Sequence, residues 1–488
     1  MSTEKYDSVI VDITEYVFRY RIESEKAWEN ARIALSDAVG CAIETVWKSE
    51  SCRKLIGPAI PRTFTFDGFR LPGTAYQTDP IKGAFDMATI IRYLDHNDAI
   101  AGADWGHPSD NIGAILAVMD WLSRSVESGK LVHTGPPLTI RTLLTAIIKA
   151  YEIQGCFLLH NAFNSHGLDH VILVKLASTA LVCWLLGLTE THTMAAISHV
   201  WMDGHPLRVY RSGSNTTPRK GWAAGEACMK AVQLAFLVRE GQPGSPTVLT
   251  MPRWGFYATM FGGKEFTFPI NYSTWVIEHV FFKVMPVEGH GVAAVEAALI
   301  IHKILRQHSL SADKDIKSIE IRTNAAANMI INKSGRLRNS ADRDHCMQYL
   351  VALAFLKGEV PEPEDFLDNS PWANDSVLNI LRDRILIRTD DQLTHDYMDL
   401  GKKSLACGVT VHLINGEVID EVLVEFPVGH VANPHTAAAV KRKFLRNMSL
   451  MFTMEEIENI TSSLQLDHMK VSHFVDLLVR ENIPTLAL

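Results

Sequence analysis

A chain of 488 residues exceeds the size at which one hydrophobic core stops growing, so its length predicts two domains. Its 47% hydrophobic and 21% charged residues are ordinary for a folded protein and argue against disorder. A formal net charge of −8, without a long run of Lys or Arg, argues against nucleic acid or an anionic membrane as a partner, because both require a concentrated basic surface.

The cysteines and the apolar runs favour a cytoplasmic protein with no cofactor. The seven cysteines are scattered without Cys-x-x-Cys spacing, which fits reduced thiols and predicts neither a zinc site nor an iron–sulfur cluster. No dinucleotide-binding or Walker motif occurs, and the first residues match neither a signal peptide nor a transit peptide. The longest apolar run, residues 171–188, contains Lys175, so we expect a core helix there and not a membrane span.

Residues 1–278 are expected to form a domain of helices. The segment LTIRTLLTAIIKAYEIQG predicts a helix that is capped by Thr139 and ends at Gly155. The segment GWAAGEACMKAVQLAFLVREG predicts another helix, bounded by Gly221 and Gly241. Because several such segments are apolar nearly all round, we expect a helical layer with a buried centre.

Residues 279–430 are expected to form a smaller α+β domain. Apolar and polar residues alternate in KSIEIRT, in RILIRTD and in ACGVTVHLINGEVIDEVLVEFP, which is typical of strands. The Asn415-Gly416 pair in the last segment predicts a hairpin with a type I′ turn.

Residues 431–488 return to helical periodicity. Thr453 and Glu456 have the spacing of a capping box at the start of one helix. We expect this segment to pack back on the first domain, which would make the α+β unit an insertion. The fold class predicted for the whole chain is therefore mainly α.

The best candidate for an active site is the segment YLDHNDAIAGADWGHPSDN, residues 93–111, which holds four aspartates and two histidines. Its two glycines and its proline prevent one continuous helix. Burial can shift the pKa of its ionisable side chains toward neutrality, as acid–base catalysis requires. The candidates of this kind are Asp95, Asp98, Asp104 and His107. The alternative is a solvated polar loop.

Three further places carry candidate residues. Asp169 and His170 begin a long apolar helix. The alternative for His170 is a buried first-turn histidine without a catalytic role. His166 lies four residues before His170, a spacing that two zinc ligands on one helix face would have, but we do not expect a zinc site here. Cations gather around the GSNTTP loop before the next helix and could hold a polyanionic small molecule, unless the loop is simply solvated. These cations are Arg208, Arg211, Arg219 and Lys220.

The third place is the segment around Lys283, which lies among aromatic residues at the expected domain junction. A lysine that reaches to the surface is the alternative there. Gly289-His290-Gly291 precedes a helix and could supply an amide that faces an anion.

At these segments the chain resembles the 2-methylcitrate dehydratase family, which also contains cis-aconitate decarboxylases. The resemblance extends from about residue 8 to the end of the chain. Besides the segment at residues 93–111, it includes AIIKAYEIQGC, GLDHVILVKLAST, TPRKGWAAGEA, PRWGFY and SADRDHCMQYLVA.

The resemblance implies a large all-helical domain with an inserted smaller α+β lid domain, a homodimer, and an active site between the domains that needs no iron–sulfur cluster. The family's proposed catalytic positions correspond to Asp95, His107, His170, Lys220 and Lys283. In elimination of water from a tricarboxylate, the two histidines would be the acid and the base, in either order. The aspartate would orient His107, and the two lysines, helped by Arg219, would hold carboxylates.

The chain also departs from the family pattern. It has Asn97-Asp98-Ala99-Ile100 where these dehydratases usually read Asn-Asp-Thr-Trp, and Met285-Pro-Val-Glu-Gly289-His290 where they usually read Phe-Pro-Ala-Glu-Phe-His. The smaller side chains, Ala99 among them, predict room for a 2-alkyl group longer than methyl. The alternatives are a decarboxylase acting on cis-aconitate and a silent tricarboxylate-binding homologue, which the missing hydroxyl at Ala99 makes conceivable.

Overall fold

The computed structural model describes residues 5–202, 204–212 and 215–481, and within them helices dominate, as the sequence predicts. The chain forms two compact units. Unit 1 contains the described residues up to Arg208, Gly221–Phe282 and the described residues from Val440. Unit 2 contains the described residues of Val209–Lys220 and Lys283–Ala439.

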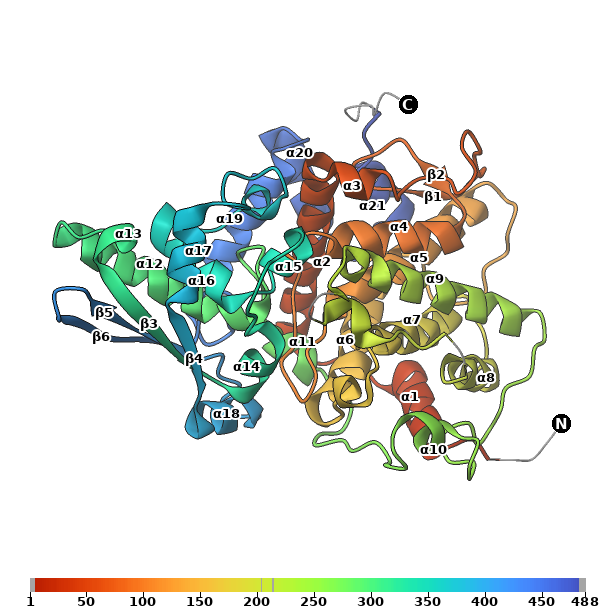
Figure 1. The fold of residues 1–488 in the computed structure, drawn as a ribbon. Helices are drawn as coiled ribbons and strands as arrows, with labels where there is room; N and C mark the ends of the chain where they lie inside the picture. The colour runs from red at the N-terminus through yellow and green to blue at the C-terminus, as the bar shows by residue number, and fades with distance from the viewer. Residues whose placement is uncertain (1–4, 203, 213–214, 482–488) are drawn as a thin grey trace. The chain divides into compact units, whose positions relative to one another are not determined.

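Unit 1 is a bundle of helices with one small two-stranded sheet (Figure 1). Its elements are α1 (Ser8–Arg19), α2 (Glu25–Lys48), α3 (Glu50–Arg53), β1 (Phe69–Arg70), β2 (Gln77–Thr78), α4 (Pro80–Arg92), α5 (Ile112–Glu127), α6 (Ile140–His160), α7 (Val171–Leu185), α8 (Glu190–Val200), α9 (Arg219–Arg239), α10 (Phe256–Met260), α11 (Trp275–His279), α19 (Thr436–Met448), α20 (Met454–Ser463) and α21 (Val471–Asp476). Helices α9 and α19 each begin in unit 2 and continue into unit 1.

Helix α6 is the apolar centre of unit 1. Among the described residues it is the one helix whose length and composition would suit a membrane span, and 94% of its apolar window is buried inside the protein. Thr139 occupies the predicted N-cap position, although its side chain accepts no capping hydrogen bond. The predicted end at Gly155 is wrong, because the helix continues to His160. A Cβ at Gly155 would lie 2.5 Å from the Val276 side chain, so this glycine allows close packing inside the helix and does not end it.

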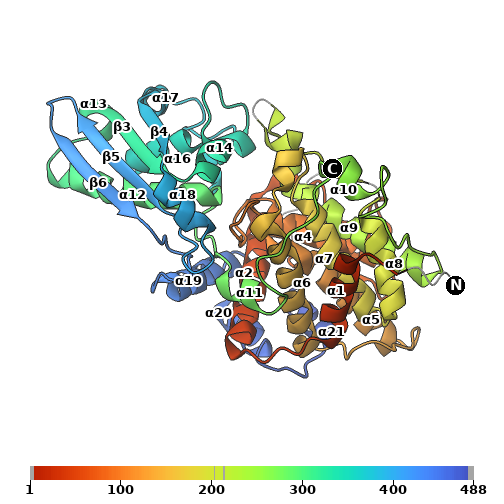
Figure 2. The ribbon, with the colours of Figure 1, turned by 90° about the horizontal axis from the view of Figure 1, so that it is seen from below.

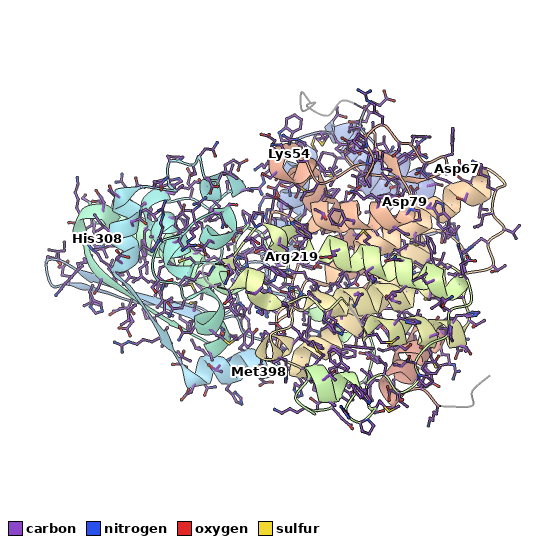
Figure 3. All side chains as sticks on the ribbon, turned by 45° about the vertical axis from the view of Figure 1, so that its right-hand side comes forward. Lys54, Asp67, Asp79, Arg219, His308 and Met398 are labelled. Carbon is purple, nitrogen blue, oxygen red and sulfur yellow. The ribbon has the colours of Figure 1, made fainter. Side chains whose placement is uncertain are left out.

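Helix α4 precedes the candidate segment in the chain, and helix α5 follows it. Asp79, labelled in Figure 3, caps α4 by accepting hydrogen bonds from the backbone N–H groups of Ile81 and Lys82. The chain leaves α4 after Arg92 and re-enters helical structure only at the 3-10 helix Pro108–Asn111, which leads into α5. The predicted interruption of the helix between residues 93 and 111 is confirmed.

Unit 2 contains a four-stranded mixed sheet with the order β4-β3-β5-β6, which Figure 2 shows from below. β3 pairs in parallel with β4 and antiparallel with β5, and β5 pairs antiparallel with β6. Helix α12 packs against β5, β6 and α16. The elements of this unit are α12 (Val292–Gln307), α13 (Ala312–Asp315), β3 (Ile316–Thr323), α14 (Ala325–Ile331), α15 (Ser340–Arg343), α16 (Met347–Lys357), α17 (Ser376–Asp383), β4 (Ile385–Thr389), α18 (Asp391–Met398), β5 (Cys407–Leu413) and β6 (Val418–Val424).

The hairpin between β5 and β6 is where the sequence predicts it, but its turn differs. Only the glycine of the Asn415-Gly416 pair has positive φ, at 93°, so the turn is not type I′. The Gly416 N–H donates to the Leu413 carbonyl at 3.1 Å and the Leu413 N–H to the Glu417 carbonyl at 2.9 Å, which makes a three-residue loop. The predicted capping box at Thr453 and Glu456 is confirmed by reciprocal hydrogen bonds.

Candidate functional site

In unit 1 the candidate segment folds into a narrow loop against α6. Ala99 and Phe281 exchange two backbone hydrogen bonds of 2.8 and 2.7 Å, and Ile100 bridges to Gly106. The loop lies so close to α6 that a Cβ at Gly102 would be 2.3 Å from the Leu158 carbonyl oxygen. The two ends of the loop, and with them Asp98 and His107, are therefore brought together.

The imidazole of His107 is oriented by the backbone of Asp98. His107 Nδ1 lies 2.7 Å from the Asp98 carbonyl oxygen, and since a carbonyl can only accept, Nδ1 carries the proton. In the neutral ring the lone pair is then on Nε2. His107 is buried, so a neutral imidazole here presents one defined basic atom.

The carboxylate of Asp98 is itself held by three donors. It accepts from the Ser109 N–H at 3.1 Å, the Ser109 hydroxyl at 2.6 Å and the Tyr151 hydroxyl at 2.6 Å. Burial raises the pKa of Asp98 to about 6, and the hydroxyl hydrogen bonds oppose this rise.

His170 lies next to His107. Their ring centroids are 5.6 Å apart with an interplanar angle of 55°. His170 occupies the N-terminal end of α7, and its Nε2 is 3.7 Å from Asp169 Oδ1. Two buried imidazoles at this separation can serve one reacting molecule as proton acceptor and proton donor.

Two aspartates of unit 1 lie near Arg208. The Arg208 guanidinium is 3.8 Å from the Asp104 carboxylate and 3.9 Å from the Asp169 carboxylate. Burial raises the pKa of Asp104 to about 6, although Arg208 and the Asn164 N–H lower it. The structure therefore places Arg208 among the carboxylates of unit 1, whereas Lys220 belongs to unit 2.

Asp95 is held in an uncommon backbone conformation. Its φ is 55°, in the left-handed region, and its carboxylate pairs with the buried guanidinium of Arg92. The predicted role of Asp95, orientation of His107, stays a prediction, because the orienting contact found for that ring is to the Asp98 carbonyl.

In unit 2 the predicted lysines lie on one connected set of polar contacts. Lys220 Nζ is 2.9 and 3.0 Å from the two carboxylate oxygens of Asp344 and 3.2 Å from His345 Nδ1. The Glu288 N–H donates to the Asp344 carbonyl at 3.1 Å. Lys283 is completely buried, which contradicts the alternative that it reaches to the surface, and its Nζ donates to the Val287 carbonyl at 3.2 Å.

His290 continues this set of contacts. Its Nδ1 lies 2.9 Å from Glu288 Oε1, and its Nε2 lies 3.2 Å from the Tyr397 hydroxyl. Its backbone N–H donates to the Glu288 carboxylate at 2.9 Å, so this one amide of Gly289-His290-Gly291 is already engaged, and the substrate-binding role of His290 stays a prediction.

The remaining candidates lie nearby or have a structural explanation. Arg219, labelled in Figure 3 at the start of α9, and Arg211 lie 5.4 and 5.2 Å from the ring centre of Tyr210. Gly213 and Ser214 of the expected anion-binding loop lie outside the described residues. His166 stacks on Phe261 at 4.1 Å, and no cluster of His, Cys, Asp and Glu among the described residues suits a metal ion.

The structure brings His107 and His170 together in unit 1, and Lys220, Lys283 and His290 into one network in unit 2. The predicted interdomain location of the site stays a prediction. Sequence reasoning missed the residues that support these side chains, namely Ser109, Tyr151, Asp344, His345, Glu288 and Tyr397. Most of them lie in segments that already carried the family resemblance, and that was the available signal.

Comparison with known proteins adds the family. The MmgE/PrpD N-terminal domain matches residues 11–269, and the MmgE/PrpD C-terminal domain matches residues 285–466. The chain is 58% identical over 482 residues to "Alkylcitrate dehydratase phiI" from a fungal species (strain ATCC 74256), covering 99% of this chain and 95% of that protein. It is 50% identical over 482 residues to a protein of the same name from Talaromyces stipitatus, with 98% of each chain covered. It is 43% identical over 482 residues to "2-methylcitrate dehydratase" of Escherichia coli (strain K12), covering 97% and 98%. The family resemblance read from the sequence is confirmed, and the chain belongs to the MmgE/PrpD family.

Proposed function

We propose that this chain is an alkylcitrate dehydratase, a hydro-lyase that converts a 2-alkylcitrate to the corresponding 2-alkyl-cis-aconitate. The observation that carries the proposal is the buried pair of imidazoles, 5.6 Å apart, with the His107 tautomer fixed. The full-length likeness to proteins named alkylcitrate dehydratase and 2-methylcitrate dehydratase supports the same reaction.

Elimination of water needs a base and an acid. The base removes a proton from a carbon next to a carboxylate, the electron pair of that C–H bond forms the new C=C bond, and the C–O bond to the hydroxyl breaks. The acid donates a proton to the departing hydroxyl, which leaves as water. We assign the base to His107, because its neutral ring offers the Nε2 lone pair. We assign the acid to His170, because it is the second buried imidazole, with its ring centroid 5.6 Å from that of His107.

The substrate's carboxylates need cations, because negative charge builds on the carboxylate next to the carbon that loses its proton. We assign this task to Lys220 and Lys283, with Arg219 in support. The buried position of Lys283 strengthens its Coulomb interaction with an anion, since the surroundings screen it less than water does. Lys220 is already paired with Asp344, which fixes the position of its ammonium group.

The length of the alkyl group is the finer part of the proposal. The expected room beside Ala99 and Gly289 favours a substituent longer than methyl. A homodimer and a cytoplasmic location, both expected from the sequence, stay predictions.

The test is to incubate the purified protein with 2-methylcitrate, 2-hexylcitrate and cis-aconitate and to identify the products by mass. We expect loss of water from the citrates, and faster turnover of the hexyl compound. Loss of carbon dioxide from cis-aconitate would instead make the chain a decarboxylase, and tight binding without any product would make it a silent homologue. Replacement of His107 or His170 by Asn should lower kcat by at least about 100-fold with a smaller effect on KM, as for loss of an acid–base group. Wild-type rates in both variants would contradict the assignment.

A further inference from the structure

One carboxylate beside the candidate site is not used by the reaction as assigned. Asp98 is 1% exposed, and its side-chain partners among the described residues are all neutral: the Ser109 amide and hydroxyl and the Tyr151 hydroxyl. A buried carboxylate without a cation costs free energy, which an asparagine of the same shape would not. The presence of aspartate instead of asparagine at position 98 therefore needs a functional explanation.

The backbone of the same residue holds the ring of His107. The peptide unit between Asp98 and Ala99 is fixed at both ends, because its carbonyl accepts from His107 Nδ1 at 2.7 Å and its N–H donates to the Phe281 carbonyl at 2.8 Å. The side chain restrains the residue further, because its carboxylate accepts hydrogen bonds from the hydroxyl of Tyr151 on α6 and from the hydroxyl of Ser109, two residues after His107.

We propose that Asp98 is a positioning residue for the dehydration, whose carboxylate holds its own carbonyl in the place that keeps His107 in the Nδ1–H tautomer. The proposal rests on the proposed function, in which His107 Nε2 is the base. A carboxylate suits the task because both of its oxygens accept, so that the N–H and the two hydroxyl groups can donate to it together.

An amide at residue 98 cannot reproduce this arrangement. Asparagine has one accepting oxygen, and its NH₂ group would face a hydroxyl that must then turn to accept. The single amide oxygen could still accept from the Ser109 N–H and hydroxyl, which already share Oδ1, but the Tyr151 hydroxyl would lose its acceptor Oδ2. The carbonyl of residue 98 would then lose its fixed direction, and His107 would be free to exchange its proton between Nδ1 and Nε2.

The experiment compares Asp98→Asn and Tyr151→Phe with a control, Asp120→Asn. Asp120 is an equally buried aspartate of unit 1 that accepts from the Arg70 N–H and the Arg124 guanidinium, outside the His107 contacts. We expect kcat for the 2-alkylcitrate to fall about 100-fold in Asp98→Asn and about 10-fold in Tyr151→Phe, with KM changed less than about 3-fold, because misplacing a reacting group by about 1 Å is that costly. Asp120→Asn should leave kcat within about 2-fold of wild type.

A second measurement does not depend on activity. Two-bond ¹H–¹⁵N spectra of histidine-labelled protein, with His107 assigned by its loss in His107→Asn, report the tautomer directly. We expect the Nδ1–H form in the wild type and a mixture in Tyr151→Phe and Asp98→Asn. If both variants keep the wild-type kcat and tautomer, the proposal is overturned. If the protein does not dehydrate alkylcitrates at all, the proposed function fails, while the tautomer comparison still decides the role of Asp98.

Discussion

Asp95 combines two features that a substitution can separate. Its φ of 55° is a conformation that most residues avoid and that Asp and Asn tolerate, and its carboxylate neutralises the buried guanidinium of Arg92. Backbone strain of this kind clusters at functional sites, where the surrounding structure enforces it. The backbone strain and the charge therefore belong to one residue but make distinct contributions to stability.

Asp95→Asn should destabilise the protein because it leaves Arg92 buried without its carboxylate, a change that costs about 3–5 kcal/mol in other buried pairs. Asp95→Ala should cost about 1 kcal/mol more, since alanine does not tolerate the left-handed region as asparagine does. Thermal unfolding of the two variants measures the difference. Equal Tm values would show that the left-handed conformation contributes no strain in solution.

At this scale the sequence indicates candidate residues, but it does not predict their contacts. Asp98 and His107 were both candidates because of their types and their place in one polar segment. That the Asp98 carbonyl orients His107 could not be predicted, because it depends on the loop closing through the bridges of Ala99 and Ile100. The sequence also could not show that the Arg208 guanidinium lies near the carboxylates of Asp104 and Asp169, since both aspartates are distant from Arg208 in the chain.

The elements around the loop are held together by very close backbone approach. The N–H groups of Ala103 and Asp104 donate to the carbonyls of Leu159 and Leu158 near the end of α6, at 3.1 Å each. Glycine at 102 is what permits this distance. The loop therefore takes its position from the last turn of α6, which exists because this helix continues past Gly155.

Gly102→Ala tests this dependence. The new Cβ would lie 2.3 Å from the Leu158 carbonyl oxygen, and since this neighbour is backbone, the loop must move away. We expect kcat to fall at least about 10-fold, because Asp98 and His107 are at the two ends of the displaced loop. Gly401→Ala is the matched control: the nearest atom to its Cβ would be Asp399 Oδ1 at 3.4 Å, an ordinary contact. An unchanged kcat in Gly102→Ala would mean that the loop is not positioned by α6.

Secondary structure was predictable where local signals act alone. The capping box at Thr453, the strands of unit 2 and the hairpin at Asn415-Gly416 follow from short patterns. The end of α6 was wrong because a glycine inside a helix can serve packing against another element, which a local pattern does not reveal. The predicted turn type was wrong because the loop has three residues instead of two, so Asn415 does not need a positive φ.

Across the whole molecule, the chain buries many ionisable groups. In unit 1, the ammonium of Lys443 donates to the His96 carbonyl at 2.6 Å and pairs with Asp37 at 2.8 Å, which ties α19 to the candidate segment and to α2. In unit 2, Glu296 on α12 accepts from the Val428 N–H at 2.8 Å. Burial raises the pKa of Glu296 to about 7, so the charged form of Glu296 destabilises the folded state.

The pH dependence follows from this shift. An unfolded chain returns Glu296 to its ordinary pKa of 4.5, so between about 4.5 and 7 the folded protein binds more protons than the unfolded one. The contribution of this group to stability is therefore highest at low pH, falls as the pH rises through that interval, and is constant above it. Other buried carboxylates, such as Asp86 and Asp120 with pKa values raised to about 7, act in the same direction.

Glu296→Gln isolates one of these contributions, because the amide oxygen can still accept from the Val428 N–H but never carries charge. We expect the variant to unfold at a higher temperature than the wild type at pH 8, and the difference to shrink or vanish at pH 5, where the wild-type carboxyl is protonated in the folded state. Thermal unfolding of both proteins at the two pH values measures this directly, and the remaining buried carboxylates cancel because both proteins contain them. A variant less stable than the wild type at pH 8 would mean that the charged carboxylate stabilises unit 2, contrary to its raised pKa.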